Sequence, residues 1–227
     1  MRRRARATAV VATAVTAVLA LTGCDGTTPT GAPSPSASST GAPLTGFAAA
    51  FLGATTTPAP EATVTPTPGT WDDVTPPAGY TMALITAGDD PASATLSDAV
   101  RGFAVEHGVA LTVLPTADDD QVEAAVNRAV GAHPDLVVGA GDGVVDVFAL
   151  LTAQHLDTQF LLVGSQLPEP TDNVTAVVWE GAGFRGSGLG SGHANPAAVT
   201  RAQSLEATRV GVTAVLYDLT GIVLDLR

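Results

Sequence analysis

Between residues 80 and 226, short runs of apolar residues alternate with longer segments whose apolar residues recur with helical spacing. The first three such pairs are Tyr80–Thr86 with Leu96–Glu106, Val109–Leu114 with Asp120–Ala132, and Leu136–Ala140 with Val144–Gln154. Three further short runs and one long helical segment follow: Phe160–Gly164, Val174–Trp179, Ile222–Leu226 and the helix Pro196–Tyr217. Because the short runs are apolar on both sides, we expect a sheet covered on both faces. The pattern predicts an α/β fold: a single doubly wound, mostly parallel sheet of about six strands, with helices on both faces.

The predicted domain spans residues 78–227, which is enough chain to bury roughly two thirds of its unfolded surface around one core. Residues 25–77 are instead dominated by Thr, Pro, Ser, Ala and Gly, without a sustained apolar period. Such a composition is typical of a disordered tether, so we assign residues 24–77 to a tether that starts at Cys24. The apolar segment 46–52 interrupts this tether, either as a short helix or as an apolar stretch without regular structure.

Residues 1–23 have the features of an export signal. Four arginines among the first six residues precede an apolar stretch from Ala7 to Leu21, which is too short for a transmembrane helix. Leu21-Thr22-Gly23-Cys24 resembles the bacterial lipobox, in which the cysteine receives a diacylglycerol before cleavage. We therefore predict a mature chain that begins at lipidated Cys24 and is anchored in a bilayer at the extracytoplasmic face of the cell membrane. An ordinary secretory signal with an incidental cysteine is the alternative.

The charge of the chain excludes one class of partner. The formal net charge is −12 at pH 7, the sequence contains no lysine, and four of its ten basic residues lie in the predicted signal. Nucleic acid is not expected as a partner, because binding phosphates requires a basic face. Cys24 is the only cysteine, so neither a disulfide nor a CxxC zinc site is expected.

Three stretches of the predicted domain carry a family resemblance: residues 133–141, 156–163 and 173–179, which read HPDLVVGAG, LDTQFLLV and NVTAVVW. In order and spacing they resemble the basic membrane lipoprotein (BMP) family. Members of that family are substrate-binding lipoproteins of ABC transporters, several of which bind nucleosides, and they are built as two α/β lobes around a hinge. The resemblance implies one lobe of a type 1 periplasmic binding protein, a small polar solute as ligand and an ABC permease as partner.

The sequence departs from this family in two respects. The loop after the first strand lacks the Ser-Phe-Asn-like stretch of the family and keeps only an acidic element, and the third strand is followed by Gly141-Asp142-Gly143 instead of an aromatic residue. Only 48 residues follow Trp179, which is too few for a second lobe. We therefore expect a single lobe, so that a complete cleft would require self-association.

Acidic residues follow the first three predicted strands. Ligands of open α/β sheets bind at the carboxyl ends of the strands, so Asp89, Asp90 and Asp142 are candidate ligand-binding residues, together with Trp179 at a strand end. Converging carboxylates hold Mg²⁺ or Ca²⁺ in other proteins, or accept hydrogen bonds from a hydroxyl-bearing solute. The alternative is helix capping, in which Asp118, Asp119 and Asp120 would also take part.

Catalytic signatures are weak. The segment 181–186 matches G-x-G-x-x-G, but it does not follow the first strand of a βαβ unit. We therefore interpret it as a flexible connection at the point where members of the family enter their second lobe. The four histidines have no ligand spacing, and Ser165 is not part of a G-x-S-x-G elbow. We therefore expect no catalytic residue, metal or cofactor.

These observations predict a non-enzymatic envelope lipoprotein whose BMP-like lobe recognises a small solute weakly or in an accessory role. A protein-interaction module that binds no solute is one alternative. A cation-dependent hydrolase or a phosphotransfer receiver is another, although a receiver needs a lysine or an equivalent cation near the phosphoryl group, and this chain has no lysine.

Overall fold

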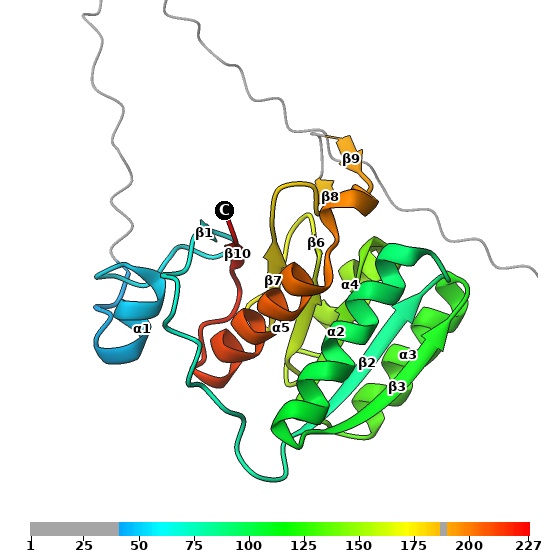
Figure 1. The fold of residues 1–227 in the computed structure, drawn as a ribbon, viewed down its shortest axis with the longest axis horizontal. Helices are drawn as coiled ribbons and strands as arrows, with labels where there is room; N and C mark the ends of the chain where they lie inside the picture. The colour runs from blue at the N-terminus through cyan, green and yellow to red at the C-terminus, as the bar shows by residue number, and fades with distance from the viewer. Residues whose placement is uncertain (1–40, 187–189) are drawn as a thin grey trace, which may run out of the picture. The chain divides into compact units, whose positions relative to one another are not determined.

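The computed structural model describes residues 41–186 and 190–227 (Figure 1). Seven strands form a sheet in which every neighbouring pair is parallel. In spatial order they are β1 (Thr63–Val64), β10 (Val223–Asp225), β7 (Val174–Val178), β5 (Phe160–Val163), β4 (Leu136–Ala140), β2 (Thr81–Ala87) and β3 (Ala110–Thr116). Six of them are the six predicted strands, which confirms the predicted α/β fold. The seventh, β1, comes from the segment that was assigned to the tether.

Helices cover both faces of the sheet, as the apolar strands require. On one face, α2 (Pro91–His107) and α5 (Arg201–Leu216) pack against alternate strand residues such as Leu84, Val138 and Leu161. On the other face, α3 (Asp119–Gly131) and α4 (Val145–Leu151) pack against the intervening residues, such as Ile85 and Leu162. Successive strand residues point to opposite faces, so the apolar runs supply two cores.

Helix α5 lies close to the sheet because of a glycine. A Cβ atom on Gly211 would come within 2.4 Å of a methyl group of Leu161, so only glycine allows this approach. Across the same face, the guanidinium of Arg209 on α5 donates two hydrogen bonds to the carboxylate of Glu106 on α2, at 2.7 and 2.9 Å. The hydrogen bonds from Arg209 hold the pKa of Glu106 below its usual value despite the opposing effect of desolvation.

The helix boundaries follow local capping chemistry. Helix α2 begins five residues before the predicted start because the Asp90 carboxylate caps it and Pro91 occupies its first turn. The last helix begins later than predicted, at Arg201, with Thr200 as its cap. Asn195 and Pro196 instead begin the short 3₁₀ helix η3 (Pro196–Ala198), and the non-helical backbone of Val199 separates it from α5.

The folded region begins before residue 78, so the predicted domain boundary lies too late in the chain. Helix α1 (Gly46–Leu52) and strand β1 both lie in the predicted tether, and β1 pairs with β10. Phe51 and Trp71 are buried in the same core as α2 and α5. Their rings meet edge to face, with centroids 6.2 Å apart. These few large apolar side chains hold a segment whose overall composition is that of a disordered chain.

A second, smaller sheet lies at the carboxyl ends of the central strands. It consists of β6 (Ser165–Gln166), β8 (Gly183–Gly186) and β9 (Gly190–Gly192), with β8 between the other two. Cys24, the predicted lipidation site, lies outside the described residues. Among residues 41–186 and 190–227, no helix combines the length and apolar character needed to cross a membrane.

Candidate functional site

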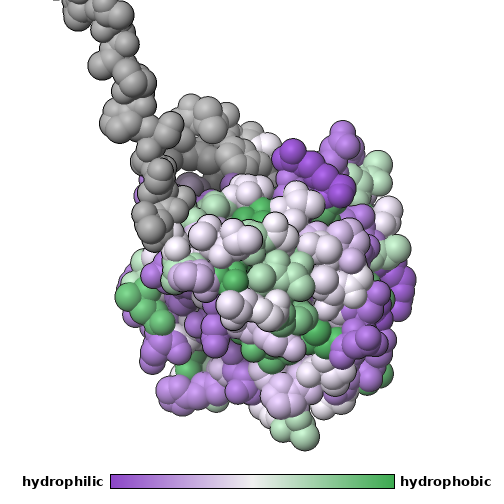
Figure 2. Space-filling view, turned by 90° about the vertical axis from the view of Figure 1, so that its left-hand side faces the viewer, coloured by the Kyte–Doolittle hydropathy of each residue, from purple (hydrophilic) through white to green (hydrophobic). Residues whose placement is uncertain are grey.

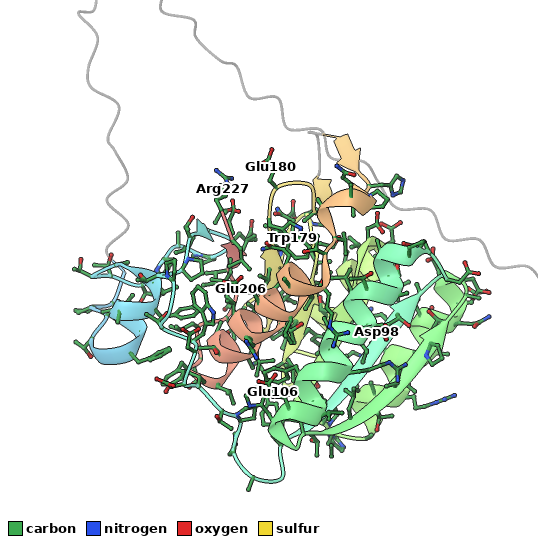
Figure 3. The ribbon with its side chains drawn as sticks, in the orientation of Figure 1. Asp98, Glu106, Trp179, Glu180, Glu206 and Arg227 are labelled. Atoms are coloured by element: carbon green, nitrogen blue, oxygen red, sulfur yellow. The ribbon has the colours of Figure 1, made fainter. Side chains whose placement is uncertain are left out.

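A cleft lies at the carboxyl ends of β7 and β10. Its volume is about 930 Å³, and the small sheet and the start of α5 border it. Figure 3 shows Glu180 and Arg227 projecting outward at this end of the molecule, beyond Trp179. The cleft is lined by two groups of residues. The polar ones are Thr63, Gln166, Glu180, Thr200, Gln203, Asp225 and Arg227. The rest of the wall consists of Val178, Trp179, Ala182, Gly183, Ala198 and Leu226. The cleft is large enough for a small organic solute.

Trp179 forms part of the cleft wall and is itself 7% exposed. Its indole Nε1 donates a hydrogen bond of 2.9 Å to the carbonyl oxygen of Ala198 in η3. The distal edge of its ring lies against Gly164, where a Cβ atom would come within 3.2 Å of it. The structure therefore places Trp179 beside the cleft. Its ring is buried in the wall of the cleft and does not present an open face on which a base could stack.

An ion pair lies at the end of β10. The Asp225 side chain is 6% exposed, and its Oδ2 lies 2.6 Å from Nε of Arg227, whose own side chain is 77% exposed. The paired guanidinium neutralises a carboxylate that would otherwise be buried without a counter-ion. The sequence analysis did not identify this pair, in which Arg227 lies beyond the last residue of β10.

The start of α5 contributes the opposite side of the cleft. Thr200 Oγ1 accepts a hydrogen bond of 3.3 Å from the backbone N–H of Gln203, and both side chains line the cleft. The positive end of the dipole of this 16-residue helix therefore lies beside amide and hydroxyl groups that donate and accept hydrogen bonds.

Asp142 does not line this cleft. It follows β4, and its Oδ2 lies 2.9 Å from Nδ1 of His193 and 3.3 Å from the backbone N–H of Ala194. A Cβ atom on Gly183 would come within 3.0 Å of Asp142 Cβ and 2.8 Å of Ser165 Oγ, so β8 packs tightly over this carboxyl edge. Asp142 thus ties the segment after β9 to the end of β4.

Asp90 is occupied by helix capping. Its Oδ1 accepts hydrogen bonds from the backbone N–H groups of Ala92 and Ser93 at 2.9 and 3.1 Å, and its Oδ2 accepts one from the Ser93 hydroxyl. Desolvation opposes ionisation of Asp90, but these hydrogen bonds outweigh it and hold the pKa of the carboxyl group below its usual value. Asp89, the neighbouring candidate, is exposed.

The predicted acidic site is therefore divided. The chain order of the strands reverses between β2 and β4, and the loops that follow them are close: Gly143 lies against Ala87, and Gly141 lies against Ser93. Asp90 and Asp142 are nevertheless engaged in separate structural contacts. Within the described ranges, no group of three or more His, Cys, Asp or Glu side chains is arranged to hold a metal ion.

No family model matches the chain, and no curated protein sequence matches it significantly. Among solved structures it is similar to ABC transporter solute-binding proteins from Aeropyrum pernix K1 and Conexibacter woesei DSM 14684, with 17% and 20% identity and TM-scores of 0.39 and 0.37. These matches cover 45% and 44% of this chain, but only 29% and 35% of those proteins. A fragment from Peptoclostridium difficile 630, provisionally named a lipoprotein, is matched over 62% of this chain and 99% of its own length, with 9% identity and a TM-score of 0.44. Similarities this weak carry no argument about function, and the fold assignment follows from the strand order itself.

Proposed function

We propose that this chain is a lipid-anchored, extracytoplasmic binding protein whose α/β lobe recognises a small polar solute in the cleft beside Trp179. The observation that carries the proposal is the cleft itself. It lies at the carboxyl edge of a parallel sheet, where α/β folds bind ligands, and it presents amides, hydroxyls and one ion pair around an apolar wall.

The proposed anchor is a diacylglycerol on Cys24, supported by the Leu21-Thr22-Gly23-Cys24 sequence after an arginine-led apolar stretch. Two acyl chains supply the stable membrane attachment that one chain does not. Membership of the BMP family, a nucleoside ligand and an ABC permease as partner belong to the same proposal, and their support is the sequence resemblance.

We propose binding rather than catalysis at this edge of the sheet. The Asp142 and His193 side chains are paired as an acid and base would be, but the His193 side chain is 87% exposed. The adjacent hydroxyl, Ser165, is completely buried beneath β8. An exposed imidazole beside an inaccessible hydroxyl does not form an activated nucleophile.

A cleft on the surface of one lobe should bind weakly, because much of the ligand stays in contact with water. We expect the monomer to bind nucleosides no better than about millimolar, near −4 kcal/mol. Titration calorimetry with a panel of neutral nucleosides tests this expectation. Binding should weaken in Gln203→Ala, which removes an amide from the cleft, and stay unchanged in Gln154→Ala, which removes an exposed amide elsewhere.

The calorimetry separates three outcomes. Weak, saturable binding that depends on Gln203 supports the proposal, and micromolar binding by the monomer would show that one lobe encloses its ligand better than expected. Equal effects of the two substitutions, or no heat of binding across the panel, would contradict solute binding in this cleft.

A further inference from the structure

Threonine–proline pairs recur along the segment between α1 and β2. Residues 54–77 contain eight threonines and six prolines, and four threonines directly precede a proline: Thr57, Thr65, Thr67 and Thr75. All four of these threonines are exposed. A residue before proline is restricted to extended backbone, which presents its side chain away from local secondary structure. The segment therefore displays several threonine hydroxyl groups at exposed positions.

The pairs at 65–66 and 75–76 are arranged with the proline inward and the threonine outward. Pro66 and Pro76 are buried, whereas Thr65 and Thr75 are exposed. Thr57 differs, because its hydroxyl donates a hydrogen bond of 3.1 Å to the carbonyl oxygen of Ala42. Neither the Thr65 nor the Thr75 hydroxyl makes such a bond to any described residue. These two hydroxyls are thus held in place by the prolines and remain available for reaction.

N-linked glycosylation of an asparagine side chain is not expected in this fold. Asn173-Val174-Thr175 matches the N-x-T acceptor pattern, but Asn173 is only 3% exposed. Its Nδ2 donates to the carbonyl oxygens of Thr152, His155 and Thr158 at 3.1, 3.0 and 2.9 Å. A glycan on this chain would therefore have to be attached to a hydroxyl group.

Thr75 borders a groove that a sugar ring would fit. The groove has a volume of about 680 Å³ and is lined by Phe47, Thr70, Asp73, Val74, Thr75, Pro77, Leu216 and Tyr217. Tyr217 is 44% exposed, and its ring stacks on that of Phe47 with centroids 3.7 Å apart. Figure 2 views the molecule from the side that includes α1, and the centre of this face is mostly of intermediate hydropathy, with hydrophilic groups around it. An amphipathic ring with apolar C–H faces and hydroxyl edges suits such a surface.

We propose that Thr75 and Thr65 are O-glycosylated, and that the glycan on Thr75 lies in the groove beside Tyr217. Segments rich in Thr and Pro are typical of O-glycosylated stalks. The threonine Oγ attacks the anomeric carbon of a glycosyl phosphate donor, forming a C–O bond to Oγ. The bond from the anomeric carbon to the phosphate oxygen breaks, the phosphate leaves with the electron pair, and the hydroxyl proton passes to a base of the transferase. The proposal rests on the extracytoplasmic location proposed above, where the segment would meet such a transferase.

Peptide mass spectrometry of the protein from the membranes of its native cells tests the modification. Cleavage before aspartate yields a peptide of residues 73–88, in which Thr75 is the threonine that precedes a proline. We expect this peptide to carry whole-hexose mass increments localised to Thr75. Unmodified Thr75, or phosphate at Thr75, would overturn the proposal.

Matched variants distinguish a site-specific modification from a general one. Thr75→Val keeps the β-branched shape and should remove the hexose from peptide 73–88. Thr55→Val removes an exposed threonine hydroxyl that does not precede a proline, and it should leave the glycan pattern unchanged. Loss of hexose in the Thr55 variant, or retention in the Thr75 variant, would contradict the assignment.

Two further readouts separate the parts of the inference. Tyr217→Ala should let exoglycosidases trim the Thr75 glycan several-fold faster, and an unchanged rate would overturn its placement in the groove. The same membrane sample reports on Cys24. Lipidated Cys24 with bare threonines would reject glycosylation alone, whereas bare threonines and an unlipidated chain would reject both glycosylation and the proposed anchor.

Discussion

Replacing Phe51 by alanine tests whether the segment before residue 78 belongs to the folded domain. Phe51 is fully buried and packs against Phe47 and Trp71, with ring centroids 5.7 and 6.2 Å apart. Truncating a buried phenylalanine leaves a cavity and costs about 3–5 kcal/mol. With a slope of about 2 kcal/mol per molar urea, the unfolding midpoint should fall by roughly 1.5–2.5 M. Circular dichroism of a soluble chain starting at residue 25 measures this shift.

Val105→Ala is the matched control, because Val105 is 84% exposed on α2. An exposed substitution of this kind should change the free energy of unfolding by no more than about 0.5 kcal/mol. If Phe51→Ala shifted the midpoint as little as this control, Phe51 would not be part of the core, and residues 46–74 would behave as the tether that composition predicts.

Three other predictions follow from single contacts. Gly183→Ala should destabilise the fold by about 1–3 kcal/mol, because its Cβ would lie 2.8 Å from Ser165 Oγ, whereas Gly192→Ala has open space and should be neutral; equal melting temperatures would refute this packing. Asn173→Ala removes the side-chain donor of three carbonyl groups, two of which still accept a backbone N–H, and should cost about 1–3 kcal/mol in urea unfolding, with a loss below about 0.5 kcal/mol counting against the network. Burial, followed by the charge of Asp135, raises the pKa of Tyr80 from 10.0 to about 12. The stability that depends on protonated Tyr80 should therefore be complete below pH 10 and be lost as the pH rises towards 12, a loss that Tyr80→Phe should remove.

The central sheet could be predicted because its strands are apolar on both sides. The predicted run at 136–140 matches β4 residue for residue, and the others differ from the observed strands by one or two residues at their ends. Strand β1 could not be predicted in this way, because two residues show no periodicity and its pairing partner, β10, lies about 160 residues away. The small sheet was missed because β8 and β9 are rich in glycine, so their pairing leaves no apolar pattern.

The candidate site was predicted less well than the fold. Aspartates at the carboxyl ends of strands cap helices as readily as they bind ligands, and only the structure shows that Asp90 caps α2 and that Asp142 contacts His193. Trp179 lies beside the cleft, but its indole N–H already donates to the carbonyl oxygen of Ala198. The Asp225–Arg227 pair was missed because its importance depends on burial at the cleft, which a short charged stretch does not reveal.

The most direct test of solute binding is to follow the two indole N–H signals of the protein by ¹H–¹⁵N NMR during a nucleoside titration. Trp179 lines the cleft, whereas Trp71 is buried beside Phe51 and serves as an internal control. We predict a saturable shift of the Trp179 signal at millimolar solute, with the Trp71 signal unchanged. A Trp179 signal that does not move for any nucleoside, or that moves in parallel with Trp71, would contradict the account.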